Sequence, residues 1–227
     1  YRNRAELPRE EDGSVDLEAL HTIDVPLFRE HMQRLLDGET VEIPRYSFHT
    51  GSRMEHGVPL QLQPGQPVLV EGIHGLNDRL TASVPNDLKF KVYISPLTVL
   101  NLDDHNRIRT TDARLLRRIV RDYQFRGTPP EQTLDMWASV RRGEEKYIFP
   151  FQENADAVFN SAHIFELPVL KYYAEPLLRR IAPSSPAYAE AYRMLKFLDY
   201  IVALTPAEMA AIPPTSILRE FIDGQIL

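Results

Sequence analysis

The stretch His105–Gly127, HNRIRTTDARLLRRIVRDYQFRG, decides the fold. Successive residues of a helix lie 100° apart, and this spacing separates five arginines of the stretch from its aliphatic residues. The arginine face comprises Arg107, Arg114, Arg117, Arg118 and Arg121, and the apolar face comprises Ile108, Leu115, Leu116, Ile119 and Val120. The sequence therefore predicts an amphipathic helix whose apolar face packs on a core.

The arginine face carries positive charge that the predicted helix does not balance. Like charges three or four positions apart cost about 0.2–0.5 kcal/mol per pair, and Asp112 and Asp122 both fall outside the arginine arc. Because the planar guanidinium matches phosphate, we expect this face to bind an anion. The alternative is that Glu131, Glu144 or Glu145 reaches across and neutralises it, since structural ion-pair networks look the same in a sequence.

Composition limits the classes of protein and of site. With 227 residues the chain is long enough for one large domain or two small ones. The formal net charge of −6 argues against a general nucleic-acid binder, and the absence of cysteine excludes disulfides and thiolate metal sites. Without an 18-residue apolar run or a signal peptide, we expect no membrane span and, by default, a cytoplasmic protein. Because the sequence opens on Tyr1 and not on methionine, we expect the chain to be a portion of a longer protein.

Hydrophobic periodicity predicts strands that alternate with helices. The predicted strands are an edge strand at 41–48 and buried strands at 67–71, 89–95 and 156–162. The predicted helices run from Pro26 to Gly38 and over 131–142, where Gly143 interrupts, 166–181, 186–200, 206–211 and 216–222. This alternation is typical of an α/β fold with a mainly parallel sheet.

Glu71 is the last residue of the predicted strand at 67–71 and is followed by Gly72. Ligands of open α/β sheets lie at the carboxyl ends of the strands, and Mg²⁺ prefers one or two carboxylates together with phosphate oxygens. Glu71 is therefore a candidate Mg²⁺ ligand; the alternative is a carboxylate that caps the next turn. His74 completes a Glu-x-x-His spacing, which by itself is a weak metal signal.

Four segments occur together in one order and spacing: VEIPRYSFHTGSR, VLVEGIHGL, TDARLLRRIVRDYQFRG and NADAVFNSA. In this combination the chain resembles the uridine kinase and phosphoribulokinase family of P-loop kinases, in particular bacterial uridine kinase-like nucleoside kinases, from about Asp16 to Ile181. The resemblance implies a P-loop kinase-like parallel sheet flanked by helices. It implies a kinase domain over 1–182 with a helical lid at about 128–151, followed by a helical C-terminal extension over 183–227.

The resemblance also implies roles for single residues. Glu18 stands where the family places an acid that binds the ribose hydroxyls of the nucleoside, and Glu71 matches an acid near Mg²⁺. Tyr46 and Phe48 stand where aromatic residues line the acceptor pocket, although the residues alone would indicate edge-strand packing. Further positions that match the family are the basic residue Arg53 and the arginines that contact substrate or phosphates, Arg118, Arg121 and Arg126.

The sequence departs from the family in three places, one of which is the lid, where Thr128 and Met136 replace polar residues of the compact enzymes. None of the ten glycines opens a G-K-[ST] triplet, so the chain lacks the loop that cradles nucleotide phosphates. In the family this loop and the general-base aspartate lie N-terminal to the position of Tyr1. Gly51 stands where uridine kinases carry a histidine that recognises the pyrimidine, so the resemblance does not identify the base of the nucleoside.

The implied activity is Mg²⁺-dependent phosphoryl transfer from ATP to a nucleoside hydroxyl by the intact parent. This chain would carry the acceptor-binding and lid portion and would be inactive alone. The alternatives are a non-catalytic anion- or nucleotide-binding module, or a kinase for another acceptor such as a sugar phosphate or pantothenate. The expected partners are ATP and a small acceptor, not nucleic acid or membrane, and the extension could mediate homo-oligomer formation.

Overall fold

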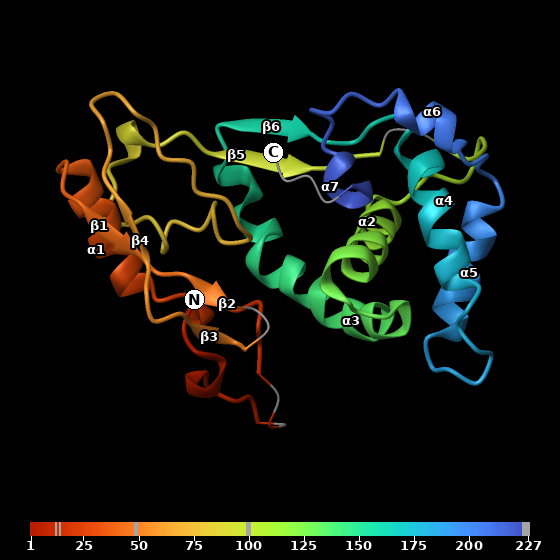
Figure 1. Ribbon diagram of the computed structural model, residues 1–227, viewed down its shortest axis with the longest axis horizontal. Coiled ribbons are helices and arrows are strands. Elements are labelled where there is room, and N and C mark those ends of the chain that lie inside the picture. The colour runs from red at the N-terminus through yellow and green to blue at the C-terminus, as the bar shows by residue number, and fades with distance from the viewer. Residues whose placement is uncertain (12, 14, 48–49, 99–100, 224–227) are drawn as a thin grey trace. The chain divides into compact units, whose positions relative to one another are not determined.

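The computed structural model describes residues 1–11, 13, 15–47, 50–98 and 101–223 (Figure 1). The chain forms two compact units that do not follow chain order. The first unit comprises Tyr1–Tyr93 and Val140–Val158, and the second comprises Ile94–Ser139 and Phe159–Leu227.

The first unit contains one long helix and two short antiparallel strand pairs. Helix α1, Val25–Leu36, begins with Pro26 in its first turn, and the Asp24 carboxylate accepts a hydrogen bond from the Leu27 N–H at 3.3 Å. Strand β1 (Val41–Ile43) pairs with β4 (Val58–Leu60), and β2 (Tyr46–Ser47) pairs with β3 (Ser52–Arg53). Short 3₁₀ helices complete the unit at Arg4–Glu6, Leu20–Thr22, Asn86–Leu88 and Phe149–Asn154.

The third strand pair joins β5, Val92–Ser95, to β6, Ala157–Asn160. Their arrows run in the same direction in Figure 1, so this pair is parallel. The division between the two units passes through both strands and through α3, Pro130–Tyr147. The small parallel sheet with its long helices makes the fold α/β, as the alternation in the sequence predicted.

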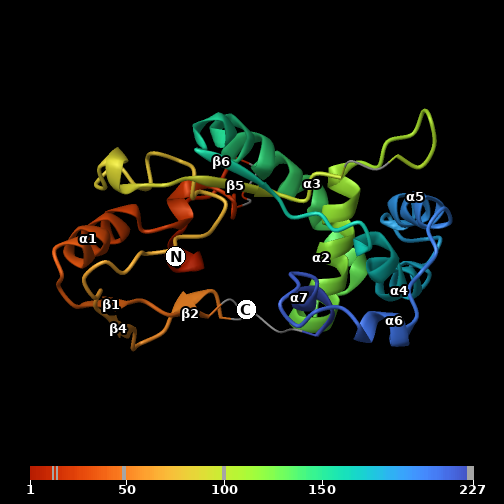
Figure 2. The same ribbon diagram turned by 90° about the horizontal axis from the view of Figure 1, so that it is seen from above.

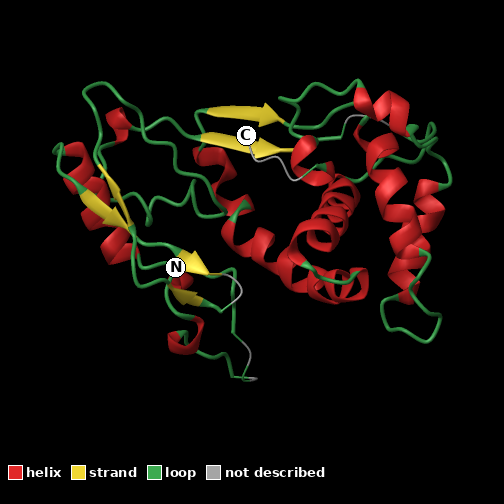
Figure 3. Cartoon of the chain, viewed as in Figure 1, coloured by secondary structure: helices red, strands yellow, loops and turns green. Residues whose placement is uncertain are grey.

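The second unit is mainly helical, as the red ribbons of Figure 3 show. The predicted arginine helix forms α2, Thr110–Arg126, and ends at Gly127, whose φ of +63° is left-handed. Helix α2 packs against α4 (Glu166–Leu178) and α7 (Arg219–Ile222), and α4 packs against α5 (Tyr188–Leu198). Figure 2 shows the same grouping from above, with α6 (Pro206–Ala210) beside α4.

The core of the second unit forms as the sequence predicted, because α2 turns its aliphatic face inward. Leu115, Leu116, Ile119 and Val120 are fully buried. They pack with aliphatic residues of α4 and α5 and with Phe221 of α7. Among the described residues, no helix has the length and apolar character that crossing a bilayer requires.

Three predicted elements differ from the structure. Residues 67–71 do not form a strand, and Leu69 in their middle is 93% exposed, because none of the described strands pairs with them. The edge strand predicted at 41–48 divides into β1 and β2, with Pro44 between them. Gly143 does not interrupt a helix, since α3 continues through it to Tyr147.

Candidate functional site

Three of the predicted arginines of α2 meet at one buried carboxylate. Arg118 Nε lies 3.2 Å from Asp122, Arg121 Nε lies 3.5 Å from it, and Arg126 Nη1 lies 3.3 Å from it. The Asp122 side chain is only 3% exposed. We call these four residues the Arg–Asp122 cluster. The helix therefore does balance part of its charge, contrary to the prediction, because Arg118 and Arg126 each lie one turn from Asp122.

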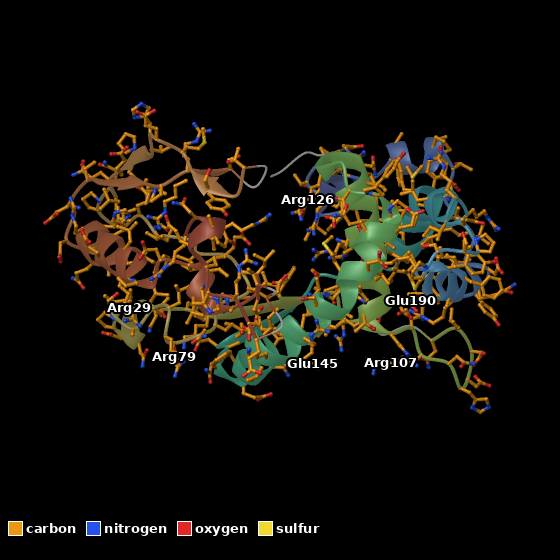
Figure 4. All side chains as sticks on the ribbon, turned by 90° about the horizontal axis from the view of Figure 1, so that it is seen from below. Arg29, Arg79, Arg107, Arg126, Glu145 and Glu190 are labelled. Carbon is orange, nitrogen blue, oxygen red and sulfur yellow. The ribbon has the colours of Figure 1, made fainter. Side chains whose placement is uncertain are left out.

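The Arg–Asp122 cluster still holds more positive than negative charge. Burial lowers the pKa of Arg121, the charge of Arg126 lowers it further, and Asp122 opposes both. A second carboxylate, Glu220 of α7, lies 3.8 Å from Arg121 Nη1. Figure 4 shows Arg126 at the end of α2. Three guanidinium groups facing two carboxylates leave a surplus that an anion can neutralise.

Arg117 does not belong to the anion-binding face that the sequence predicted. It is buried, donates to Glu166 of α4 at 2.7 Å, and donates to the Ser161 carbonyl at 2.9 Å. Its guanidinium also lies 5.3 Å from the centre of the Phe221 ring. Arg117 lies at the edge of the arginine arc, so helix packing turns its long side chain towards α4 and α7.

Arg107 and two of the glutamates that were expected to neutralise the arginine face contact other residues. Arg107 precedes α2 and donates to the Thr98 carbonyl at 3.2 Å. Glu144 and Glu145 both pair with Arg141 of their own helix, at 2.7 and 3.2 Å.

In the first unit, the predicted acceptor-binding residues gather around Tyr1. Burial raises the pKa of the Tyr1 phenol, and the charges of Glu71 and Glu18 raise it further, as does Tyr46. The Tyr1 and Tyr46 rings lie 5.3 Å apart. The Tyr1 phenol therefore lies within electrostatic range of Glu18, Tyr46 and Glu71, which come from distant parts of the sequence.

Arg53 anchors the N-terminal segment to α1. Its Nη2 donates to Asp24 at 2.9 Å, its Nε donates to the Tyr1 carbonyl at 2.8 Å, and its backbone N–H donates to the Asn3 side chain at 2.9 Å. Burial raises the pKa of Asp24, but the hydrogen bonds from Arg53 and Leu27 lower it below its usual value. Arg53 consequently has a structural role beside the one predicted.

Contacts on three sides fix Glu18. Its backbone N–H donates to Asp16 Oδ1 at 3.1 Å, and its carbonyl lies 2.9 Å from His74 Nε2. Its side chain lies against Gly143 of α3, where an added Cβ would come within 2.8 Å of Glu18 Cβ and Cγ. Tyr147, one turn further along α3, donates its hydroxyl to Asp16 Oδ2 at 2.7 Å. The last turns of α3 and the Asp16–Glu18 segment therefore hold one another.

His74 is a neutral hydrogen-bond donor. Its side chain is buried, and because the Glu18 carbonyl can only accept, Nε2 carries the proton. The buried Nδ1 has no hydrogen-bond partner among the described residues. Burial lowers the pKa of the imidazole more than the carbonyl of Glu18 raises it. His74 is thus a structural contact of Glu18.

The predicted site residues lie in different units. Glu18, Tyr46, Arg53 and Glu71 belong to the first unit, whereas Arg118, Arg121 and Arg126 belong to the second. Phe48 lies outside the described residues. Glu71 is exposed, and the described residues contain no group of three or more histidine or acidic side chains arranged for a metal.

Sequence reasoning missed the residues that support Glu18 and the Arg–Asp122 cluster. Gly143 looked like a helix stop, although the apolar and charged residues around it keep a helical spacing. Asp16 precedes Glu18 by two positions, a spacing that favours a local side-chain-to-backbone hydrogen bond. Asp122 lies four positions after Arg118 and four before Arg126. This spacing favours ion pairs along a helix, although Asp122 falls outside the arc of the arginines in the helical projection.

Comparison with known proteins identifies the family of the chain. Residues 3–167 match the family model described as "Phosphoribulokinase / Uridine kinase family". The chain is 29% identical over 160 residues to a uridine kinase of Halobacterium salinarum, 28% identical over 159 residues to one of Bacillus pumilus, and 27% identical over 159 residues to one of Macrococcus caseolyticus. Each alignment covers 70% of this chain, and respectively 63%, 67% and 68% of the relative, so the chain spans about two thirds of their length.

Proposed function

Because the chain belongs to the phosphoribulokinase/uridine kinase family, we propose that it supplies the acceptor-binding and phosphate-contacting parts of an ATP-dependent nucleoside kinase. The relatives named uridine kinase support a nucleoside as the acceptor. The observation that carries the proposal is the Arg–Asp122 cluster, with three guanidinium groups on one buried carboxylate. Phosphoryl transfer depends mainly on positioning and on stabilising phosphate charge, which is what such a cluster offers.

The residues of the two units take separate roles in this proposal. Glu18 accepts hydrogen bonds from the ribose hydroxyls, and Tyr46 lines the acceptor pocket, with Phe48 and Arg53 assigned there by the family pattern. Arg118, Arg121 and Arg126 bind the charge of the transferring phosphates. Residues of about 128–151 form a lid that excludes water, within a kinase domain over 1–182, and the helices of 183–227 form an extension.

Glu71 is the proposed Mg²⁺ ligand. Its exposed carboxylate is an oxygen donor of the class that Mg²⁺ prefers, and Mg²⁺ sites of kinases commonly use one or two carboxylates beside the phosphates. Bound Mg²⁺ would neutralise phosphate charge during transfer. Glu71 would orient the ion relative to the acceptor.

The 227 residues contain no G-K-[ST] triplet, so we expect them to bind ligands without turning them over. Incubation of the purified chain with ATP, Mg²⁺ and a nucleoside panel should give no nucleoside monophosphate. Uridine and polyphosphate should still bind in calorimetric titrations. Turnover by the chain would show that its catalytic parts are misassigned here, and preference for a sugar phosphate or pantothenate over every nucleoside would replace the proposed acceptor.

The phosphate-contacting role is tested by Arg121→Ala. Loss of a charge-assisted hydrogen bond should weaken tripolyphosphate binding by about 1.5–3 kcal/mol, which is roughly tenfold or more. Arg179→Ala is the matched control, because Arg179 is an exposed arginine of the same unit that already pairs with Glu175 at 2.5 Å. Equal affinities for both variants and the unsubstituted chain would reduce the Arg–Asp122 cluster to a structural ion pair.

A further inference from the structure

Gly143 occupies a buried position inside α3, where glycine is an unexpected choice. Glycine is among the poorest helix formers because it loses the most backbone freedom. Its φ is not in the left-handed region, so backbone geometry does not require it. Another reason must therefore favour glycine at this position.

The packing of Glu18 supplies that reason. A Cβ added to Gly143 would lie 2.8 Å from Glu18 Cβ and 2.8 Å from its Cγ. Such distances are far shorter than ordinary van der Waals contact between carbon atoms. Cβ is fixed to the backbone, so a change of rotamer cannot move it away. Only a shift of the Glu18 backbone or of the α3 backbone at Gly143 would relieve the overlap.

The Glu18 backbone is held on both sides and cannot shift freely. Its N–H is bound by Asp16 and its carbonyl by His74 Nε2. Asp16 is in turn bound by Tyr147, and the His74 and Tyr147 rings make an edge contact with centres 5.4 Å apart. Moving Glu18 away from α3 would break or strain these contacts, all of which lie in the first unit.

We propose that Gly143 and His74 are positioning residues that fix the Glu18 carboxylate for two neighbouring hydroxyl groups of the acceptor. This inference rests on the proposed function, which assigns the ribose hydroxyls to Glu18. Gly143 sets how closely the side chain approaches α3, and His74 sets the backbone from which it projects. A carboxylate held in this way is preorganised, so it loses little freedom when it binds.

The decisive experiment is titration of the 227-residue chain with uridine and, separately, with tripolyphosphate. Gly143→Ala should weaken uridine binding at least tenfold and leave tripolyphosphate binding unchanged, because the Arg–Asp122 cluster lies in the other unit. Arg142→Ala is the matched control, since Arg142 is an exposed neighbour in the same helix. It should bind both ligands as the unsubstituted chain does.

Variants of His74 test the proposal independently, because they leave the sequence of α3 unchanged. His74→Gln retains a side-chain N–H that can donate to the Glu18 carbonyl, so it should bind uridine within about twofold of the unsubstituted chain. His74→Leu leaves that carbonyl without its donor, and uridine binding should weaken several-fold. Equal binding by both variants would remove His74 from the proposal.

Thermal unfolding distinguishes the contact between Gly143 and Glu18 from the effect of helix propensity. Alanine is the better helix former, so Gly143→Ala alone should raise the melting temperature if only helix propensity matters. We expect it to lower the melting temperature when Glu18 is present and to raise it in a Glu18→Gly background, where the overlapping atoms are gone. A rise in both backgrounds would overturn the proposed contact.

The outcomes also distinguish the two levels of the proposal. If the unsubstituted chain binds uridine and Gly143→Ala binds it equally well, the positioning role is wrong and the proposed function stands. If the unsubstituted chain binds no nucleoside, the proposed function fails and the positioning role fails with it. Tight uridine binding by Glu18→Gln would overturn the role of the carboxylate itself.

Discussion

The two units are stabilised by different interactions. The second unit buries a continuous set of aliphatic side chains from α2, α4, α5 and α7, and its helices meet along their apolar faces. In the first unit, the described residues bury only a few scattered apolar side chains, namely Leu7, Ala19, Leu35, Val41, Leu80 and Val84. Short strands and long loops there are joined by hydrogen bonds of Asn3, Arg53, Asp16, His74 and Tyr147.

This difference determines how each unit responds to substitution. A hydrophobic core tolerates small polar changes at its surface, but a cavity or an unpaired buried charge lowers its stability. A unit held by individual hydrogen bonds depends instead on single donors and acceptors. The proposed acceptor-binding residues therefore lie in the unit where loss of one hydrogen bond lowers stability most. The proposed phosphate-binding residues lie in the unit with the larger hydrophobic core.

The largest effect is expected from Glu166→Ala in the second unit. The Arg117–Glu166 pair is almost completely buried, with side chains 9% and 3% exposed. Removal of one partner leaves an uncompensated charge, so the free energy of unfolding should fall by about 3–5 kcal/mol. Denaturant titration followed by circular dichroism measures this loss.

The comparison variant for that prediction is Glu175→Ala. Glu175 is in the same helix, α4, and its partner Arg179, which follows the last residue of α4, is 58% exposed. Its loss should cost less than about 1 kcal/mol. If both variants lose the same stability, burial does not distinguish the two ion pairs and the contrast drawn here is wrong.

A smaller effect is expected from Tyr147→Phe in the first unit. The change removes the hydroxyl that donates to Asp16 at 2.7 Å, and the hydrogen bond to a charged, partly buried acceptor should contribute about 1.5 kcal/mol. Burial raises the pKa of Asp16, but this hydrogen bond and the Glu18 N–H lower it below its usual value, so the hydroxyl stabilises the ionised carboxylate.

Hydrogen exchange locates the effect of Tyr147→Phe. Amides around Asp16–Leu20 should exchange faster, whereas those of α2 and α4 should not change. Tyr200→Phe, at a 73% exposed tyrosine of the second unit, serves as the control and should leave all of them unchanged. Faster exchange throughout the chain would mean that the two units unfold as one.

The smallest effect is expected from Glu220→Gln in α7. Glu220 is 40% exposed and lies 3.8 Å from Arg121, so it competes only weakly with a bound anion. Its neutralisation should tighten tripolyphosphate binding by about 1.4- to 5-fold at low salt, which corresponds to roughly 0.2–1 kcal/mol, and less at high salt. Asp199→Asn removes the same charge beside Lys196 and controls for net charge. Weaker binding by Glu220→Gln would instead make Glu220 a support of Arg121.

The local elements of the second unit could be predicted from the sequence because their signals are local. The helices α2, α4, α5, α6 and α7 appear within a few residues of the expected bounds, and the apolar face of α2 forms the expected core. By contrast, the strand expected at 67–71 does not form, since a strand requires a neighbouring strand and apolar periodicity alone does not specify one.

The candidate sites show the same limit. The resemblance identified Glu18, Tyr46 and Glu71 separately, but nothing in their spacing indicated that Tyr1 would lie among them. The arginine periodicity identified α2 correctly but could not separate Arg117, which is buried against Glu166, from Arg118 on the Arg–Asp122 cluster. Neighbouring arginines differ only in what packs against them.

By itself the sequence determined the α/β class, the family, and the helix that carries the arginines, because residue order and helical spacing are enough to specify them. The tertiary structure decided which guanidinium groups share Asp122 and which one is buried. It also decided that Gly143 makes room for Glu18. These outcomes depend on contacts between segments far apart in the chain, whose distances no local pattern encodes.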